Sequence, residues 1–255
     1  MPSEAITISV VSHAHGALVG RLLDDIAAHV RTEVEVLLTL NVPEPVEPQW
    51  RALPVRLHTI ANERPKGYGA NHNAAFRQAR GRFFCVMNPD LQLSRDPFPP
   101  LVAALADARN GVAAPLVTDA AGCVEDSARR FPTFVSLAAK ALHRRPVLDY
   151  AIGNAPFFPD WVAGMFMLFR NETYAALGGF DERYFLYYED VDLCRRLRAR
   201  GMQVVVVPQA SVVHLARRAS HRDLRHLRWH MGSALRYLVG PRRQLSPLAR
   251  PARLS

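Results

Sequence analysis

The chain has 255 residues, 49% of them hydrophobic and 22% charged, which predicts a folded globular protein and excludes a mainly disordered one. Its longest apolar run, 161–169, has nine residues, whereas a helix that spans a membrane needs about 20. The net charge of +9 lies in residues 209–255, where ten arginines stand against one acid, Asp223.

The cysteine pattern and the first residues of the chain bear on the compartment. Cys85, Cys123 and Cys194 lie too far apart to form a CxxC metal site or to suggest a disulfide framework. The first residues have neither the basic start nor the apolar run of a secretion signal. We therefore expect a protein of the reducing cytoplasm.

Strand-like and helix-like segments alternate through the first half of the chain. This alternation predicts a mostly parallel sheet with helices on both faces. Such a sheet binds ligands at the carboxyl ends of its strands, so we expect the functional loops at the ends of the first four. The predicted elements, in chain order, are strand 5–12, helix 16–30, strand 34–40, strand 55–60, helix 69–80, strand 82–87, helix 97–109 and strand 112–116.

The second half of the chain has a less regular pattern. Residues 119–122 read as a turn between two short strands, and 131–159 is rich in aromatic residues and proline. The elements predicted there are a helical piece at 135–142, strand 163–169, helices 171–177 and 189–200, and strand 204–207.

A basic amphipathic helix is predicted at 221–238. Two interpretations stay open: the helix packs on the core with its arginines in solvent, or it lies on an anionic membrane surface. Nothing in it resembles a nucleic-acid-binding motif, so we expect no nucleic-acid partner. His226 and His230, four residues apart, have no third metal ligand near them. The apolar residues that share one face are Leu224, Leu227, Met231, Leu235 and Leu238.

Two acidic segments follow predicted secondary structure. Asn88-Pro89-Asp90 comes directly after a buried strand, where a carboxylate can hold the Mg²⁺ or Mn²⁺ that bridges a diphosphate, although the triplet is also an ordinary turn. Glu189, Asp190 and Asp192 open a helix behind four aromatic residues. They either cap the helix dipole or supply a general base whose pKa is raised by burial.

Eight segments, in this order, resemble the family 2 glycosyltransferases of the GT-A fold, and most of all the rhamnosyltransferase-like branch that builds bacterial surface polysaccharides. The resemblance covers residues 5–216. It implies a Rossmann-like, mostly parallel sheet with a C-terminal helical extension. The segments are 8–12 (ISVVS), 62–73 (NERPKGYGANHN), 88–90 (NPD), 128–132 (ARRFP), 162–164 (VAG), 178–182 (GGFDE), 189–193 (EDVDL) and 212–214 (VVH).

The resemblance implies a binding site for a nucleoside diphosphate sugar and a divalent metal. Asp90 would be the main metal ligand, with Asn88 in place of the first acid of the family's DxD motif and His214 completing the shell. Asn41 departs from the Asp-Asn pair usual in the family, because Leu40 precedes it. The remaining residues implied for nucleotide and donor binding are Ser12, His13, Asn62, Gly67, Gly69, Asn71, Asn73, Ala163 and Gly164.

The resemblance also implies the reaction. Asp190 would be the base that deprotonates the acceptor hydroxyl in a single inverting displacement, with Glu189 and Asp192 orienting the acceptor or tuning Asp190. We therefore expect Asp90 and Asp190 to face each other across one donor site. Residues expected on the acceptor side are Arg129, Arg130 and Phe131.

The sequence thus predicts one GT-A domain at 1–216, with a nucleotide-binding half near 1–116 and an acceptor half near 117–216. A basic helical tail follows at 217–255. The expected activity moves rhamnose or another hexose from a nucleotide sugar to a cell-surface glycan or lipid-linked acceptor, with the tail on the inner leaflet. Two alternatives remain: a non-catalytic protein that binds nucleotide sugars or glycans, and a sugar-phosphate nucleotidylyltransferase, which would need a phosphate loop that 12–16 does not supply.

Overall fold

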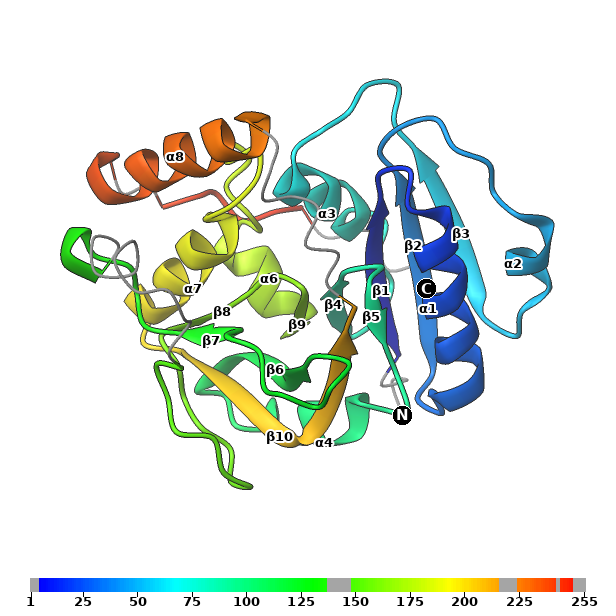
Figure 1. The fold of residues 1–255 in the computed structure, drawn as a ribbon, viewed down its shortest axis with the longest axis horizontal. Coiled ribbons are helices and arrows are strands. Elements are labelled where there is room, and N and C mark those ends of the chain that lie inside the picture. Colours follow the sequence, from blue (N-terminus) through cyan, green and yellow to red (C-terminus); the bar gives the residue numbers. More distant parts are fainter. Residues whose placement is uncertain (1–4, 137–147, 216–223, 242–243, 250–255) are drawn as a thin grey trace.

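The computed structural model describes residues 5–136, 148–215, 224–241 and 244–249 (Figure 1). Its main element is an eight-stranded sheet in the order β3-β2-β1-β4-β9-β6-β10-β5, beside a two-stranded sheet, β7-β8. The strands are β1 (Ile6–Ser12), β2 (Val34–Leu40), β3 (Arg56–Ala61), β4 (Phe83–Met87), β5 (Leu91–Gln92), β6 (Asn110–Thr118), β7 (Ala128–Arg129), β8 (Trp161–Val162), β9 (Phe166–Arg170) and β10 (Gln203–His214). The helices are α1 (Gly16–His29), α2 (Pro48–Ala52), α3 (Tyr68–Phe76), α4 (Phe98–Ala104), α6 (Asn171–Leu177), α7 (Glu189–Ala199) and α8 (Leu224–Val239).

The predicted sheet is confirmed, and its strand order fixes where a ligand can bind. From β1 the chain runs outward through β2 and β3, then returns to place β4 on the other side of β1, all four strands being parallel. The carboxyl ends of β1 and β4 therefore meet where the winding reverses, the place at which such sheets bind ligands. The predicted loops after Ser12 and Met87 flank this point.

Two strands break the parallel pattern. β9 runs antiparallel between β4 and β6, and β5 pairs antiparallel with the end of β10. These insertions bring the second half of the chain into the same sheet as the first. The two halves of the chain therefore share one continuous sheet.

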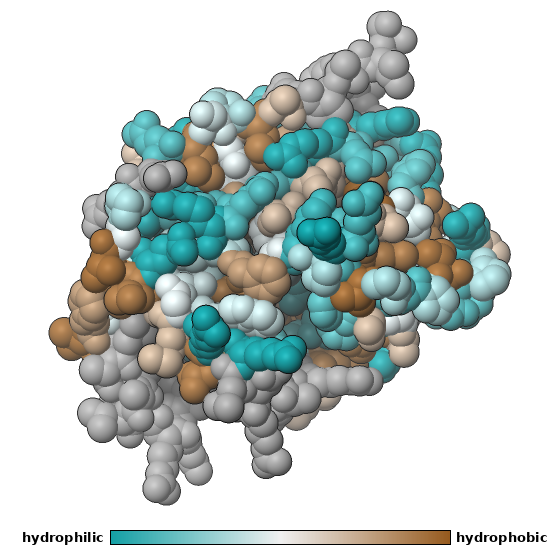
Figure 2. Space-filling view, turned by 90° about the horizontal axis from the view of Figure 1, so that it is seen from above, coloured by the Kyte–Doolittle hydropathy of each residue, from teal (hydrophilic) through white to brown (hydrophobic). Residues whose placement is uncertain are grey.

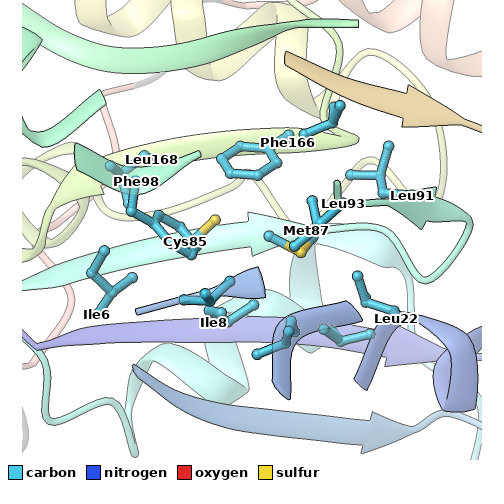
Figure 3. Packing of buried hydrophobic residues seen from close by; sticks show 14 of the residues in the cluster. Ile6, Ile8, Leu22, Cys85, Met87, Leu91, Leu93, Phe98, Phe166 and Leu168 are labelled. Carbon is cyan, nitrogen blue, oxygen red and sulfur yellow. The ribbon is translucent and has the colours of Figure 1, made fainter. Parts of the chain in front are cut away.

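The core lies on both faces of this sheet because alternate residues of each strand point to opposite sides. Ile6, Ile8 and Cys85 pack with Leu22 of α1 and Phe98 of α4 on one face (Figure 3). Phe84, on the opposite face, meets Phe76 of α3 and Tyr174 of α6, with ring centroids 4.8–5.1 Å apart. Complete burial of each such side chain stabilises the fold by roughly 1.5–3 kcal/mol.

Several predicted boundaries are wrong for identifiable reasons. The strand expected at 163–169 begins only at Phe166, as β9, because residues 163–165 form the connection from β8, which belongs to the other sheet. β10 continues past the expected end at Val207, because a register shift beside β6 accommodates Pro208, which has no N–H to donate. α4 stops at Ala104, whose carbonyl accepts a hydrogen bond from the Asn110 side chain.

The C-terminal helix corrects a second expectation. Leu227, Met231 and Leu235 of α8 are exposed, so most of the predicted leucine face does not pack on the core as one interpretation proposed, although Leu238 is partly buried against it. Ser233 and Tyr237 on another face are buried instead. The expected helical piece at 135–142 appears as helical residues 134–136, and its remainder lies outside the described residues. Within the part of the chain that the structure describes, no helix is long and apolar enough to cross a membrane.

Candidate active site

A cluster of amide side chains lies at the carboxyl ends of β2 and β3. The Nδ2 of Asn41 donates to His13 Nδ1 at 3.2 Å and to the Lys66 carbonyl at 3.0 Å. Its Oδ1 accepts bonds from the Lys66 backbone N–H and from Asn62 Nδ2. Asn62 also donates to Asn71 Oδ1 at 2.6 Å. Four of the predicted nucleotide-binding residues are therefore together, and they shape the backbone of the loop ahead of α3.

The side chains of Ser12 and Asn73 form hydrogen bonds within the protein. The Ser12 hydroxyl accepts a bond from the His15 N–H and closes the turn before α1. Asn73 Oδ1 accepts bonds from Tyr174 and the Phe180 N–H, while its Nδ2 donates to the Phe180 carbonyl and to Glu182. All hydrogen-bonding positions of the Asn73 amide are thus used inside the protein, and the structure does not bring it to the predicted ligand.

Gly67 and Gly69 bring the loop ahead of α3 against the loop ahead of α7. A Cβ on Gly67 would lie 2.7 Å from the Phe185 carbonyl oxygen, and one on Gly69 would lie 2.5 Å from Phe180 Cβ. The Tyr68 N–H donates to the same Phe185 carbonyl at 2.9 Å. These glycines therefore permit close contact between two protein loops, in addition to the role in nucleotide and donor binding that the resemblance implies for them.

Asp90 and His214 meet across the sheet. Asp90 Oδ2 lies 3.2 Å from His214 Nε2, and His214 Nδ1 lies 2.7 Å from Glu125 Oε2. The hydrogen bond with Asp90, followed by the other interactions with the two carboxylates, raises the pKa of His214 to about 9. The second oxygen of Asp90, Oδ1, is buried and has no protein partner in the described structure.

Tyr68 connects the turn after β4 with the start of α7. Its hydroxyl lies 3.0 Å from Asn88 Oδ1 and 2.6 Å from the Gly164 carbonyl. The Gly164 N–H in turn donates to Asp190 Oδ2 at 2.9 Å. Burial, then the nearby negative charges of Glu189, Asp190 and Asp90, raises the pKa of Tyr68 well above its usual value. The two predicted acidic segments therefore contribute to one site.

The acids that open α7 differ in their surroundings. Burial raises the pKa of Asp190, while backbone N–H bonds from Gly164 and Val191 and the charge of Arg129 act in the opposite direction. Burial, together with the charge of Asp190, raises the pKa of Glu189 well above its usual value. Glu189 Oε2 is buried without a partner, so the proton is more stable on Glu189 and the negative charge on Asp190.

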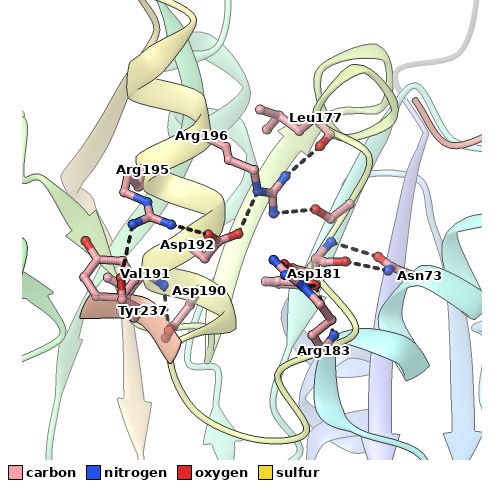
Figure 4. A network of polar contacts seen from close by, with 12 residues as sticks. Asn73, Leu177, Asp181, Arg183, Asp190, Val191, Asp192, Arg195, Arg196 and Tyr237 are labelled. Carbon is pink, nitrogen blue, oxygen red and sulfur yellow. Dashed lines mark hydrogen bonds and ion pairs between the residues drawn. The ribbon is translucent and has the colours of Figure 1, made fainter. Parts of the chain in front are cut away.

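Asp192 points away from this pair. Its two oxygens bind Arg195 at 2.8 Å and Arg196 at 2.7 Å, and Arg196 also donates to the carbonyls of Leu177 and Gly179 (Figure 4). Both carboxylate oxygens are thus engaged in holding α7 against the 177–179 turn. In the structure Asp192 therefore anchors α7. Asp192 is not among the groups that shift the pKa of Asp190.

Arg129 is the predicted acceptor-side residue that acts on Asp190. It pairs with Asp126 at 3.0 Å and lies over the Trp161 ring, 5.3 Å from its centroid. Ala163, beside it, donates its N–H to the Ser127 carbonyl. The structure thus holds Arg129 of β7 against Trp161 of β8, with its charge close enough to lower the pKa of Asp190.

Arg130 and Phe131 face a different segment. The guanidinium of Arg130 lies over Tyr150, 5.8 Å from the ring centroid, and its N–H donates to Asp149. The Phe131 N–H donates to Asp160. Both residues therefore border the 149–160 segment.

The backbone before α7 is strained. Tyr187 and Tyr188 have φ angles of 70° and 67°, in the left-handed region that is unfavourable for residues with a bulky side chain. Each such residue costs of order 1–3 kcal/mol, and surrounding contacts must hold it in place. Hydrogen-bond and ring contacts with α8 hold Tyr187 and Tyr188 in this conformation. α7 can therefore begin at Glu189, which places Glu189 and Asp190 in its first turn.

Sequence reasoning missed two residues of this arrangement. Tyr68 lies inside the 62–73 segment, but only its neighbours, such as Gly67 and Gly69, were predicted to bind the nucleotide. Glu125 stands with Asp126 after a turn, and no local pattern distinguishes it from a solvated surface residue. Glu125 is brought to His214 because its N–H donates to the Val117 carbonyl of β6, which pairs with β10.

The residues around Asp90 fit a divalent metal. Asp90 supplies an unpartnered buried oxygen, and His214 supplies an imidazole nitrogen beside the second oxygen. No cluster of three or more His, Cys, Asp or Glu residues arranged around a metal position occurs among the described residues. An ion there would therefore need oxygens from the ligand as well as from the protein.

A cavity of about 480 Å³ lies elsewhere, beside the 178–183 turn. Asn73, Phe180 and Leu248 are among its lining residues, and neither Asp90 nor Asp190 borders it. We do not assign the donor to this cavity, because it lacks the groups that bind metal or abstract a proton.

The sheet, the switch point and the paired acidic loops together define a glycosyltransferase of the GT-A type. The chain belongs to the glycosyltransferase-like family 2, whose family model matches residues 2–232. This confirms the predicted family.

Two curated relatives confirm the rhamnosyltransferase-like branch. Rhamnosyltransferase WbbL of Escherichia coli (strain K12) is 28% identical over 261 residues, covering 93% of this chain and 94% of that protein. The N-acetylglucosaminyl-diphospho-decaprenol L-rhamnosyltransferase of Mycobacterium tuberculosis (strain CDC 1551 / Oshkosh) is 30% identical over 278 residues, covering 93% of this chain and 85% of that protein.

Two solved structures confirm the fold. GalNAc-T7 with UDP, GalNAc and Mn²⁺ matches with a TM-score of 0.65 at 16% identity, over 84% of this chain and 44% of that one. Mannosyltransferase PcManGT from Pyrobaculum calidifontis, in complex with GDP-Man and Mn²⁺, matches with a TM-score of 0.63 at 18% identity, over 92% of this chain and 65% of that one. This chain thus spans less than two thirds of either protein.

Proposed function

We propose that the protein transfers a sugar from a nucleoside diphosphate sugar to an acceptor hydroxyl with inversion at the anomeric carbon. The contact chain that carries this proposal runs from Asn88 through Tyr68 and Gly164 to Asp190. It spans the distance between the turn suited to a diphosphate and the carboxylate suited to a base. Both ends of one displacement are therefore served by a single site.

In the proposed reaction Asp190 takes the proton of the acceptor hydroxyl as the acceptor oxygen forms a bond to the anomeric carbon. The bond from that carbon to the diphosphate breaks, and its electron pair leaves with the diphosphate. Two backbone N–H groups hold the Asp190 carboxylate in position, and the raised pKa of Glu189 favours its protonated form, which adds no second negative charge. The charge of Arg129 lowers the pKa of Asp190 and thereby favours its ionised form.

We propose Asp90 and His214 as the residues that hold Mg²⁺ or Mn²⁺, with Asn88 beside them. When bound, such a cation supplies positive charge that stabilises the departing diphosphate. Glu125 orients His214 by accepting a bond from Nδ1, which directs Nε2 toward Asp90. The Mn²⁺ in the two solved structures supports this assignment.

The relatives support a finer substrate proposal. We propose rhamnose or another hexose as the donor sugar, and a lipid-linked glycan as the acceptor, because one relative is named for a decaprenol-linked substrate. Residues 1–116 would bind the nucleotide and 117–216 the acceptor, on the cytoplasmic side of the membrane. The product would serve polysaccharide biosynthesis.

A two-stage experiment tests the proposal. Melting temperatures are first measured against a panel of nucleotide sugars with and without Mg²⁺ or Mn²⁺, where a ligand at 100 times its Kd adds about 2.7 kcal/mol to stability. Release of nucleoside diphosphate is then compared between wild type and Asp190→Asn, for which we expect a loss of about 10²–10⁴ in kcat with donor binding retained.

The control is Asp107→Asn, which alters an exposed ion pair with Arg109. It should leave turnover unchanged. A wild-type rate in Asp190→Asn would show that Asp190 is not the base. Donor binding without turnover in the wild-type protein, under every acceptor tried, would favour the alternative of a non-catalytic sugar-nucleotide-binding protein.

A further inference from the structure

The outward face of α8 carries a row of exposed apolar side chains. Leu227, Met231, Leu235 and Val239 are 56%, 62%, 60% and 63% exposed, and they recur at every fourth position of the helix. Residues spaced in this way lie along one face. Figure 2, which views the molecule from above, shows hydrophobic side chains toward the left edge, on the side where Figure 1 places α8.

Arginines border this apolar row. Arg225, Arg228 and Arg236 are all exposed, and α8 contains no aspartate or glutamate. Phe134 and Val135, early in the second half of the chain, are also exposed apolar residues, at 61% and 79%. Positive charge beside an apolar helix face is the arrangement that binds anionic lipid headgroups and inserts into the boundary below them.

The inward face of α8 contacts the strained loop ahead of the catalytic carboxylates. Trp229 packs on Phe185, with ring centroids 4.9 Å apart, and His226 Nδ1 lies 3.0 Å from the Tyr187 hydroxyl. Ser233 donates its hydroxyl to the Leu186 carbonyl at 2.9 Å. α8 therefore fixes residues 185–188 on one side and presents an apolar, basic face on the other.

We propose that the outward face of α8 docks on an anionic lipid bilayer, with Leu227, Met231, Leu235 and Val239 inserted at the interface. Docking places the 185–188 loop, and with it Asp190, on the far side of α8 from the lipid, about one helix diameter (~10 Å) from the membrane surface. The docking itself follows from the helix, whereas the benefit of delivering a lipid-linked acceptor to Asp190 rests on the proposed function. Of the two interpretations of this helix, the lipid surface is the one that its exposed apolar row and arginines fit.

Flotation with vesicles tests the docking without donor or acceptor. The full chain should float with phosphatidylglycerol–phosphatidylcholine vesicles. The triple variant Leu227→Gln/Met231→Gln/Leu235→Gln should bind these vesicles at least about tenfold more weakly than the wild type. Arg228→Gln and Arg236→Gln should each weaken binding by about fivefold, and added salt should do the same. The matched control is Phe158→Gln, which removes a 46% exposed aromatic residue outside α8 and should float like the wild type.

Folding is checked in every variant by circular dichroism and melting temperature, which should not change because the altered side chains are exposed. Equal flotation of the triple variant and wild type, or no flotation of the wild type, would overturn the proposal. So would sedimentation showing a wild-type dimer that the triple variant converts to monomer, because the face would then bind a second copy. Loss of vesicle binding with intact turnover on a water-soluble acceptor supports docking as a property separate from catalysis.

Discussion

At the scale of single residues, the ionisation of Asp190 depends on a few groups with opposing effects. Burial favours its protonated form, and two backbone N–H bonds together with Arg129 favour the carboxylate. Arg129 is itself held by Asp126 and the Trp161 ring, so its charge has a fixed position. The neighbouring Arg130 faces Tyr150 and is not among the groups that shift the pKa of Asp190.

Replacing Arg129 by glutamine should therefore move the acid limb of the pH–rate profile upward. The base must be ionised to accept a proton, and removal of the nearby positive charge raises the pKa of Asp190 further. The measurement is kcat/KM against pH. Arg130→Gln is the matched comparison and should leave the limb where it is; a downward shift in Arg129→Gln would contradict the assignment.

At the scale of elements, the site depends on contact between the loop ahead of α3 and the loop ahead of α7. Gly67 lies against the Phe185 backbone, and the Tyr68 N–H bonds to the same carbonyl. Tyr68 then extends to Asn88 and Gly164. A small separation of the two loops would thus disturb both the diphosphate turn and the carboxylates.

Gly67→Ala should lower both stability and turnover. The new Cβ would approach the Phe185 oxygen to 2.7 Å, and relieving such an overlap typically costs about 1–3 kcal/mol. Chemical unfolding and kcat are measured together. Gly153→Ala, where nothing lies within 4 Å of the new Cβ, serves as the control and should change stability by less than about 0.5 kcal/mol. A neutral Gly67→Ala would show that the loops separate without cost.

At the scale of the whole molecule, two histidines give stability opposite pH dependences. His72 is fully buried beside Tyr68, with Nδ1 on the Ser9 hydroxyl and Nε2 without a partner, and burial lowers its pKa to about 3. As pH falls below 6.5 the unfolded chain takes up a proton that folded His72 refuses, so stability declines. His214, with its pKa raised to about 9, retains its proton when folded, so its contribution is complete below pH 6.5 and is lost as pH rises toward 9.

The metal-free protein should consequently lose stability on the acid side at up to about 1.4 kcal/mol per pH unit between 6.5 and 3 on account of His72. The measurement is the free energy of unfolding by denaturant at a series of pH values, in the presence of a chelator. His72→Gln should flatten this limb relative to wild type while leaving the alkaline limb in place. An unchanged acid slope in His72→Gln would refute the assignment.

The sequence alone determined the alternation of strands and helices in the first half, and it singled out the two acidic loops. Those features are local: β-branched runs form strands, turn residues end them, and a carboxylate after a strand must lie at the edge of the sheet. Boundaries failed where distant partners decided them, as at Pro208, which is accommodated by the register shift against β6.

Only the tertiary structure decided which polar residues remain available to a ligand. Asn73 is the same residue type as Asn71 in one short segment, and Asp192 is the same residue type as Asp190 in another. In the structure, however, hydrogen bonds and ion pairs within the protein occupy the whole side chain of Asn73 and both carboxylate oxygens of Asp192. Glu125 reached His214, and Tyr68 reached Gly164, across 89 and 96 residues of chain. A sequence records the hydrogen-bonding capacity of each side chain, but the partner that uses this capacity is fixed by which strands and loops the fold brings together.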